Sequence, residues 1–277
     1  MKNRLFSYRI ADTYIHRLSG LTKLICFLLL TFAVMFSYDI RVILSIMAFS
    51  LVLLGHAQIK FSQVRLMVAY ATFFLVTNAT LTYLFSPEEG VKIYGTRHEI
   101  ARLTARYTLT QEQLFYLATK FLKYASVIPL GLIFLLTTNP SEFAAALNGV
   151  GVNCKAAYAV ALTLRYFPDI QRDYLHISQA QQARGLELSK KEKFAKRVGN
   201  ALLIIIPLVF STLARIELIS NAMDLRGFGK HKKRTWYNGR RLTRPDHLAI
   251  LLSALIFAVT VLISVFINKS RFYNPFA

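Results

Sequence analysis

The sequence has little cysteine. Its 277 residues include only Cys26, inside an apolar block, and Cys154, in a polar stretch. Neither has a second cysteine or a histidine at the spacing of a metal site, and two residues in such different surroundings do not form a disulfide framework. A disulfide-rich secreted domain and a cysteine-ligated metal centre are therefore excluded.

Signatures of nucleotide hydrolysis and metal catalysis are also missing. No G-x-x-x-x-G-K-[ST] segment occurs, and Gly227–His231 matches only a fragment of one. No H-E-x-x-H occurs, and the six histidines are scattered, at positions 16, 56, 98, 176, 231 and 247. We therefore expect a non-catalytic chain with no catalytic residues, no cofactor, no metal and no ATP hydrolysis of its own.

Acidic residues are scarce: 14 stand against 34 basic residues, which gives a net charge of +20. In a soluble protein such an excess favours nucleic acid as a partner. Here 18 of the basic residues, with only eight acids, fall between positions 139 and 246. Because cytoplasmic segments of membrane proteins carry such an excess, we expect this segment to be cytoplasmic. The first 20 residues lack an apolar run, so no cleavable signal peptide is expected.

Long apolar blocks are what the sequence has in quantity, at 55% hydrophobic residues and a mean hydropathy of +0.41. A bilayer core needs about 20 mostly apolar residues per helix. Two blocks form a short hairpin that only just crosses such a core, and three more are long enough to span it. In chain order the blocks are Leu24–Phe36, Val42–Gly55, Leu66–Phe85, Leu114–Leu136 and His247–Ile267.

The charged and polar segments between these blocks set the expected organisation. The basic residues of positions 1–23 should face the cytoplasm, and the polar loop 87–111 should be external. Lys120 and Lys123, three apart in an apolar block, should snorkel or point into protein. We expect a membrane domain at 1–138 with its N-terminal cytoplasmic segment, a cytoplasmic domain at 139–246, and a final transmembrane helix with its tail at 247–277.

The cytoplasmic segment predicts three helices. Asn139-Pro140-Ser141-Glu142 has the residues of a helix start, and a short helix should run through Leu147. Long helices should follow at about 155–184, kinked at Pro168, and about 195–226, with a possible kink at Pro207. The apolar stretch Leu202–Leu213 is short for a span, so it should be buried in protein or lie in the membrane interface. The fold class expected is all-α: a polytopic membrane protein with about five membrane-embedded helices and a module of long amphipathic helices.

The two long helices end in the same register, A-x-x-[A/L]-R-G, 42 residues apart. The candidate site residues are Ala183, Arg184, Gly185, Leu225, Arg226 and Gly227. Each glycine stands where a left-handed C-terminal cap belongs, and each arginine presents a planar fork that can bind a carboxylate in the last turn. The alternative is an ordinary helix stop, since a cation at a helix C-terminus and a following glycine are both common.

Apolar stripes lead toward both arginines. One contains Ile170, Tyr174, Ile177 and Gln181, and the other contains Leu213, Ile216, Ser220 and Met223. The spacing of 3 and 4 residues is typical of one face of an amphipathic helix. Each stripe could bind a partner or pack on the membrane core, and a helix can do both with different faces.

These features resemble the transmembrane T component of energy-coupling factor transporters, the prokaryotic ABC importers of vitamins and metal ions. The paired Ala-Arg-Gly motif of that family is intact at Ala183-Arg184-Gly185, whereas the second copy reads Leu225-Arg226-Gly227. The segment Ile15–Leu24 is similar to the family's "hRLDPRTKL" but lacks the central Asp-Pro-Arg. Thr137–Glu142 and Leu164–Pro168 also match in character.

The resemblance implies a multi-pass subunit of a prokaryotic cell membrane that couples ATP hydrolysis to transport. Its motif arginines would engage two ABC ATPase subunits, and a separate substrate-binding S component would pack on it. The transported vitamin or metal ion would be recognised by the S component, so this sequence does not identify it.

Two other functions remain open from the residues alone. A membrane-embedded enzyme acting on a lipid-like substrate would need a polar cluster, and Asp169 and Asp173 share a face with Arg165 and Arg172, although i,i+4 pairing explains them better. A nucleic-acid-binding protein could use the basic loop 228–246, which contains Trp236 and Tyr237. Anionic membrane lipid is the better partner for that loop, so no nucleic acid is expected.

Overall fold

The computed structural model describes residues 13–59, 61–102, 107–186, 194–230, 235–236, 239–240, 242–268, 270 and 272–276. Two predictions fall partly outside these ranges. They concern the basic residues at positions 2, 4 and 9, expected to face the cytoplasm, and the basic loop, of which 231–234, 237–238 and 241 are not described. The chain forms two compact units, one from residues 1–139 with 240–277 and one from residues 140–239. We call them the membrane unit and the helical module and describe each by itself.

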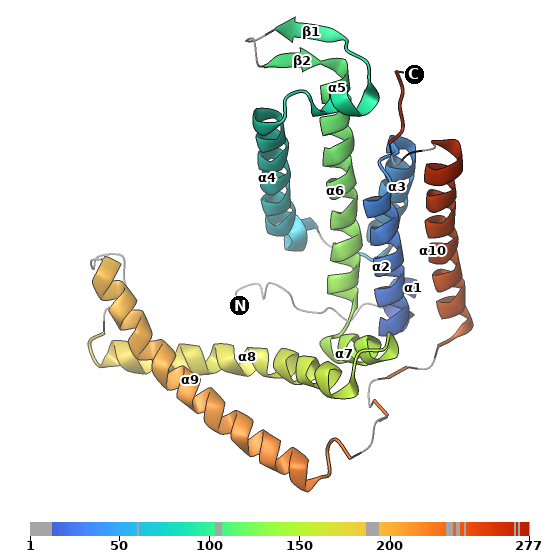
Figure 1. The fold of residues 1–277 in the computed structure, drawn as a ribbon. Coiled ribbons are helices and arrows are strands. Elements are labelled where there is room, and N and C mark those ends of the chain that lie inside the picture. Colours follow the sequence, from blue (N-terminus) through green and yellow to red (C-terminus); the bar gives the residue numbers. More distant parts are fainter. Residues whose placement is uncertain are drawn as a thin grey trace. The chain divides into compact units, whose positions relative to one another are not determined.

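The membrane unit is almost entirely helical, which confirms the predicted all-α class (Figure 1). Four of its helices are α2 (Gly20–Phe36), α3 (Ile40–His56), α4 (Phe61–Phe85) and α6 (Gln111–Thr137). The chain returns at its end as α10 (Arg244–Leu262), which continues as a π-helical turn, η1 (Ile263–Ile267). Short helices α1 (Tyr14–Arg17) and α5 (Glu89–Tyr94) and the hairpin β1 (Glu99–Arg102) and β2 (Thr108–Thr110) complete the unit.

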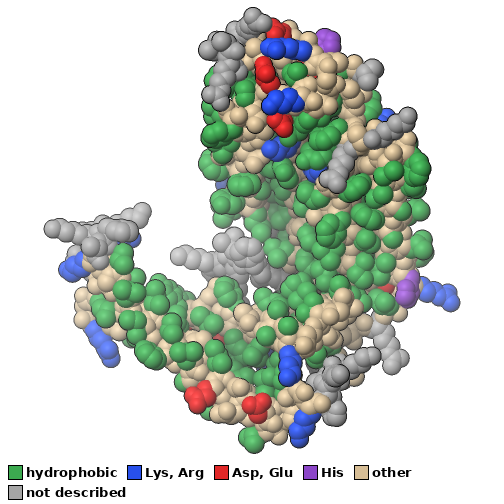
Figure 2. All heavy atoms as spheres, in the orientation of Figure 1, with side chains coloured by type: hydrophobic (Ala, Val, Ile, Leu, Met, Phe, Trp, Pro, Cys, Tyr) green, Lys and Arg blue, Asp and Glu red, His purple; other side chains and the backbone are tan. Residues whose placement is uncertain are grey.

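Helices α2 and α3 form the short hairpin predicted from the sequence. Each has 17 residues, so each is about 25 Å long at 1.5 Å per residue, less than the roughly 30 Å of a bilayer core. By length and composition alone, α4, α6, α9 (Phe194–Leu225, in the helical module) and α10 with η1 can each cross a membrane. Figure 2 shows hydrophobic side chains over the visible face of the membrane unit, with charged side chains gathered near the hairpin.

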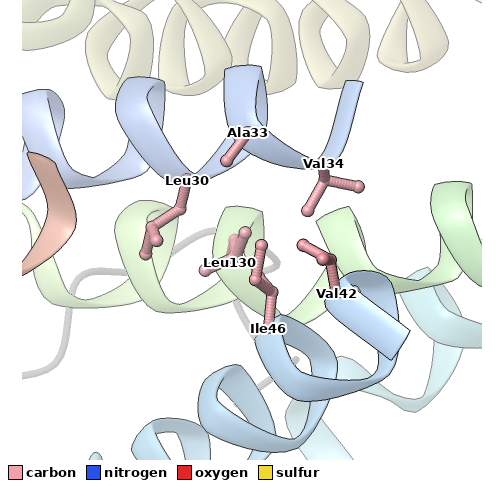
Figure 3. Packing of buried hydrophobic residues seen from close by; sticks show 6 residues of the cluster. All are labelled: Leu30, Ala33, Val34, Val42, Ile46 and Leu130. Atoms are coloured by element: carbon pink, nitrogen blue, oxygen red, sulfur yellow. The ribbon is translucent and has the colours of Figure 1, made fainter. Parts of the chain in front are cut away.

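The core of the membrane unit lies where α2, α3 and α6 meet (Figure 3). Aliphatic side chains from all three helices point toward one another there and are at most 8% exposed; they are Leu30, Ala33, Val34, Val42, Ile46 and Leu130. Partly buried side chains such as Phe27, Met35 and Val127 pack against this cluster. This packing fixes the short hairpin α2–α3 against the long helix α6.

One buried carboxylate joins the N-terminal ends of α2 and α10. Asp246 accepts hydrogen bonds from the backbone N–H groups of Thr243, at 2.8 Å, and Ser19, at 2.9 Å. The first N–H groups of a helix have no partner within the helix, so a carboxylate at this place is favourable. Asp246 therefore connects residues that lie 227 positions apart in the chain.

The two lysines of α6 were predicted either to snorkel or to point into protein, and the structure shows the second. Lys123 is 2% exposed, and its ammonium donates to the Met35 carbonyl in the last turn of α2 at 2.7 Å and lies 3.3 Å from the centre of the Tyr38 ring. Lys120 donates to the Thr82 hydroxyl of α4 at 2.8 Å. Both therefore connect neighbouring helices within the apolar part of the unit.

A second buried lysine also connects α2 and α6, but here the lysine belongs to α2 and the carbonyl to α6. Lys23, in the first turns of α2, donates to the carbonyl of Thr137, the last residue of α6, at 2.8 Å. Antiparallel α2 and α6 thus each supply an ammonium group to a carbonyl near the C-terminus of the other. The last four carbonyls of a helix lack partners within the helix, and a cation there also interacts favourably with the helix dipole.

The loop 87–111, predicted only as a polar external loop, contains regular secondary structure. It contains α5 and the hairpin β1–β2, and the start of α6 organises it. The Glu112 carboxylate is fully buried and accepts hydrogen bonds from the His98 ring at 2.6 Å and from the His98 backbone N–H and the Thr96 hydroxyl at 3.1 Å. These contacts bridge 14–16 residues, so no local pattern in the sequence indicates them.

Gly90 lets α5 lie directly on the backbone of α6. A Cβ at this position would stand 2.5 Å from the Glu112 carbonyl oxygen and 2.7 Å from the Gln113 Cα, and backbone atoms cannot move aside cheaply. We expect Gly90→Ala to lower the thermal stability of the purified chain by about 1–3 kcal/mol, through overpacking. Gly55→Ala is the matched control, because nothing lies within 4 Å of its Cβ. Equal melting of the two variants in detergent would contradict this close approach.

The C-terminal tail, predicted only as short, packs along the same end of the membrane unit as the hairpin. Phe272 stacks on Tyr38 at 4.5 Å, and the Asn274 amide donates to the Tyr94 carbonyl. Phe276 packs edge-on against Tyr94 at 5.9 Å. Burial and the neighbouring Tyr116 raise the pKa of Tyr94 to about 12, so this phenol stays neutral. The tail therefore connects α2, α5 and α10.

A carboxylate at the turn between α2 and α3 holds the start of this tail. Asp39, fully buried, accepts hydrogen bonds from Arg41 at 2.9 Å and from Asn268 at 3.0 Å. Burial raises the pKa of the Asp39 carboxyl, but the hydrogen bonds from Arg41 and Asn268 outweigh burial, so this pKa lies below its ordinary value. Asp39 also caps α3, through the backbone N–H of Arg41.

The helical module contains α7 (Pro140–Gly149), α8 (Cys154–Ala183) and α9. The three helices predicted for this part of the chain are confirmed, each within about two residues of the expected bounds. Seven apolar side chains of the stretch 202–213 are 45–67% exposed: Leu202, Leu203, Ile205, Ile206, Val209, Phe210 and Leu213. The prediction that this stretch is buried in protein is therefore wrong for the chain by itself, because α9 packs on α8 along only part of its surface. The membrane-interface alternative stays a prediction.

Candidate functional site

Helix α8 ends in a complete Schellman motif, in which two backbone N–H groups beyond the helix bond back to its last turn. The N–H of Gly185 donates to the Gln182 carbonyl at 2.9 Å, and that of Leu186 donates to the Gln181 carbonyl at 3.1 Å. Gly185 has φ of +88°, the left-handed conformation that this motif requires and that glycine adopts without strain. The glycine thus stops the helix directly after Arg184.

Helix α9 ends in the same way. The N–H of Gly227 donates to the Asp224 carbonyl at 2.9 Å, and that of Phe228 donates to the Met223 carbonyl at 2.9 Å. Gly227 has φ of +66°. The repeated sequence register therefore corresponds to a repeated backbone structure, and both glycines are placed as predicted.

Each motif arginine occupies the capping position of its helix and is exposed. Neither guanidinium makes a hydrogen bond or ion pair with the part of the chain that the structure describes. Leu225, which replaces the alanine of the first motif, is 90% exposed. The two ends thus present an unpaired planar cation beside a small residue in one case and beside a large apolar residue in the other.

The predicted stripes are only partly free. Tyr174 is 44% exposed and Ile216 is 54% exposed, whereas Ile170, Ile177 and Met223 are half-buried. The Gln181 amide donates to the Leu203 carbonyl at 3.5 Å, so the end of the first stripe faces α9. These stripes therefore contribute to packing between α8 and α9 and still leave apolar surface exposed.

The acids of α8 do not pair as predicted. Asp169 pairs with Arg172 at 2.5 Å, but Asp173 pairs across the helices with Arg215 of α9 at 2.6 Å. Pairing of Asp173 within α8 is wrong, because Arg215 approaches from the other helix. Arg165 is left without an ion pair among the described residues. The ion pair between Asp173 and Arg215 links α8 to α9.

A pocket near the end of α9 was not predicted. It has a volume of about 460 Å³ and contains Arg226 of the second motif together with Arg165 of α8. Its other lining residues are Ser141, Cys154, Tyr158, Ala161, Leu162, Phe228, Thr235 and Trp236. The spacing of Cys154, Tyr158, Leu162 and Arg165, one face of α8, was the available signal.

Aromatic contacts form one wall of this pocket. Phe228, just beyond the cap of α9, lies 4.8 Å from Tyr158 of α8, and Trp236 lies 6.5 Å from the same ring. The Trp236 indole donates to the Asn148 side chain at 3.1 Å. The left-handed turn at Gly227 thus folds the chain back, so that the pocket brings together α7, α8 and the segment after α9.

Within the described ranges, no three His, Cys, Asp or Glu side chains are placed to hold a metal ion. The exposed groups of the site are cations and apolar side chains. Such a surface is suited to binding carboxylates and apolar side chains of another macromolecule.

Comparisons with known proteins give a consistent result. A family model described as CbiQ, cobalt transport protein, matches residues 11–237. The energy-coupling factor transporter transmembrane protein EcfT of Streptococcus equi subsp. equi is 27% identical over 261 residues, covering 90% of this chain and 92% of that protein. The protein of the same name from Thermotoga maritima is 24% identical over 263 residues, covering 92% of this chain and 91% of that protein.

One further similar protein has a different name. A putative ABC transporter ATP-binding protein of Bifidobacterium longum is 30% identical over 149 residues. The match covers 51% of this chain but only 18% of that protein.

Proposed function

We propose that the chain couples ATP hydrolysis by two ABC ATPase subunits to substrate uptake, because it belongs to the CbiQ family of transport proteins and is the membrane component of an energy-coupling factor transporter. The observation that carries the proposal is the pair of identical Schellman ends with exposed arginines. Two similar helix ends suit two similar partners. The site residues are Arg184 and Arg226, with Ala183, Gly185, Leu225 and Gly227 around them.

Several features support ATPase partners in particular. The sequence lacks a phosphate-binding loop, so hydrolysis would occur on other subunits. The similar protein from Bifidobacterium longum is named as an ATP-binding protein of an ABC transporter, so sequence of this kind occurs in one chain with that function. The half-exposed stripe residues Ile170, Tyr174, Ile177, Ile216 and Met223 would carry the apolar part of the contact.

The other partners follow from the same family assignment. A separate S component would bind a vitamin or metal ion and pack on this subunit, and membrane lipid would surround α4, α6 and α10. The protein would lie in a prokaryotic cell membrane with its helical module in the cytoplasm. No nucleic acid is part of this function.

The purified chain alone should hydrolyse no ATP, whereas its complex with the ATPase subunits and an S component should. The physical reason is the missing phosphate-binding loop. The measurement is phosphate release from detergent-purified chain, chain plus ATPases, and ATPases alone. Robust hydrolysis by the chain, at a level that contaminating ATPases cannot explain, would overturn the coupling function.

Topology provides an independent test of the cytoplasmic placement. In a background with Cys26→Ala and Cys154→Ser, a cysteine replacing exposed Ile100 of the hairpin should react with an impermeant maleimide added to intact cells. A cysteine replacing exposed His176 of α8 should react only after the cells are opened. The excess of basic residues at positions 139–246 is the physical reason. The reverse labelling pattern would invert the proposed orientation.

A further inference from the structure

The pocket at the end of α9 has a charge that no described part of the chain neutralises. Arg165 and Arg226 both line it, and neither makes a hydrogen bond or ion pair with the residues that the structure describes. Among the described residues that line it, none is Asp or Glu. Two unpaired guanidinium groups at one cavity favour an anion, and a carboxylate fits their planar forks.

Apolar and aromatic side chains line much of the rest of the pocket, with Ser141 and Thr235 among its polar residues. Tyr158 contacts both Phe228 and Trp236, and the three rings form a wall beside the two cations. A volume of about 460 Å³ lies within the roughly 300–1,000 Å³ of small-ligand pockets, which suits a few side chains of a peptide segment. The two acyl chains of a phospholipid are too large for it. Its shape and charge therefore fit an acidic side chain next to an apolar one.

We infer that this pocket receives an acidic side chain and a neighbouring apolar side chain from one ATPase subunit, and that Arg165 is a binding residue in addition to Arg226. The inference rests on the proposed function and extends it. Arg226 is then one side of a receiving pocket, and Arg184 is not among the residues that line it. The two ATPase contacts therefore differ, although the two helix ends share one backbone motif.

The chain contains two natural reporters of this pocket. Trp236 is its single tryptophan, so fluorotryptophan introduced into this chain alone gives one fluorine NMR signal from the pocket wall. Cys154 lines the same pocket, and in a Cys26→Ala background it is the only thiol of the chain. Binding of the ATPase pair should shift the Trp236 signal and slow maleimide labelling of Cys154. Vesicles containing phosphatidylglycerol, without ATPases, should do neither.

Variants test the role of Arg165. Arg165→Ala should weaken ATPase binding by about tenfold or more, because a charge-assisted contact in a partly buried pocket is lost. Arg165→Lys should restore part of the affinity. Arg172→Ala is the matched control, since Arg172 lies on the same helix but pairs with Asp169 outside the pocket, and it should bind like wild type. Normal elution of each variant in size-exclusion chromatography shows that it is folded.

The outcomes separate this inference from the proposed function. If Arg226→Ala loses the ATPases but Arg165→Ala binds normally, or if binding leaves Trp236 and Cys154 unchanged, the pocket is not the receiving site and only this inference falls. If the phosphatidylglycerol vesicles alone shift Trp236 and protect Cys154, the occupant is a lipid phosphate and the inference is also wrong. If ATPases do not bind the wild-type chain at all, the proposed function itself fails.

Discussion

Replacing both Arg184 and Arg226 with alanine should leave the chain folded in the membrane but abolish its assembly with the ATPase subunits and the transport that depends on them. Both side chains are exposed and unpaired among the described residues, so their removal breaks no contact within the described chain. The loss of a cation at an exposed helix C-terminus costs only about 0.3–1 kcal/mol. Each Schellman motif consists of backbone hydrogen bonds and should persist.

The expected loss of binding is much larger than this. Truncating one partner of a buried, hydrogen-bonded charge pair at an interface costs about 2–5 kcal/mol. Two such losses at two contacts should reduce assembly below detection in a pull-down of the ATPases. Lysine at both positions should restore only part of the binding, because an ammonium group cannot reproduce the two parallel hydrogen bonds of a guanidinium.

The measurement is pull-down together with substrate uptake, at matched amounts of folded subunit. The control replaces one arginine on each of the same helices, far from the C-terminal ends that carry the motif. These are Arg172 of α8 and Arg197 in the first turn of α9, each changed to alanine. The control should assemble and transport like wild type. If the Arg184 and Arg226 double variant does so too, both arginines are ordinary helix-end cations and the proposed docking is wrong.

The helix ends could be predicted from the sequence because their determinants are local. Gly185 and Gly227 are each the residue that a left-handed cap requires, and the cap bonds reach back only a few residues. The apolar blocks predicted α4, α6 and α10 for a similar reason, since about 20 mostly apolar residues are sufficient to indicate a span. Helix α9 also has the length and composition of a span, although its continuous apolar stretch was predicted to be too short. Local composition also predicted that α2 and α3 are short.

The features that were missed depend on residues far apart in the chain. The hairpin in the loop 87–111 is held by Glu112, whose partners lie 14–16 residues earlier. Asp173 pairs with Arg215, 42 positions away, although arginines on its own helix offered a simpler assignment. The pocket requires Phe228 to fold back on Tyr158. Spacing on one helix cannot indicate such contacts, because they depend on how the helices pack.

Lys123→Met should weaken packing of the membrane unit, although it removes a charge from an apolar helix. Methionine has a similar length but donates no hydrogen bond, so the Met35 carbonyl in the last turn of α2 loses its partner. An unpaired buried carbonyl costs about 1–3 kcal/mol, and within a bilayer no water can replace the missing donor. The contact of the ammonium group with the Tyr38 ring, at 3.3 Å, is also lost.

The cost of burying the ammonium group does not cancel this loss. A charged residue at the centre of a membrane helix costs about 2.5–3.5 kcal/mol when that helix enters the bilayer. Most of this cost is present before α6 packs against α2, because an isolated α6 already carries Lys123 in hydrocarbon. Packing then provides the carbonyl and the ring. Lys123→Met should therefore ease membrane insertion while it weakens the association of the inserted helices.

These opposite effects can be measured separately. The amount of inserted chain should be unchanged or higher for Lys123→Met, and the thermal midpoint of the purified protein in detergent should fall. Lys120→Met is the control, because Lys120 donates to the Thr82 hydroxyl, and that hydroxyl also bonds to the Asn78 carbonyl within α4. Loss of the Lys120 hydrogen bond leaves no helix-end carbonyl unpaired, so Lys120→Met should lower stability by about 0.5–1.5 kcal/mol at most. A midpoint for Lys123→Met at or above that of wild type would show that removing the buried charge outweighs the hydrogen bond to α2.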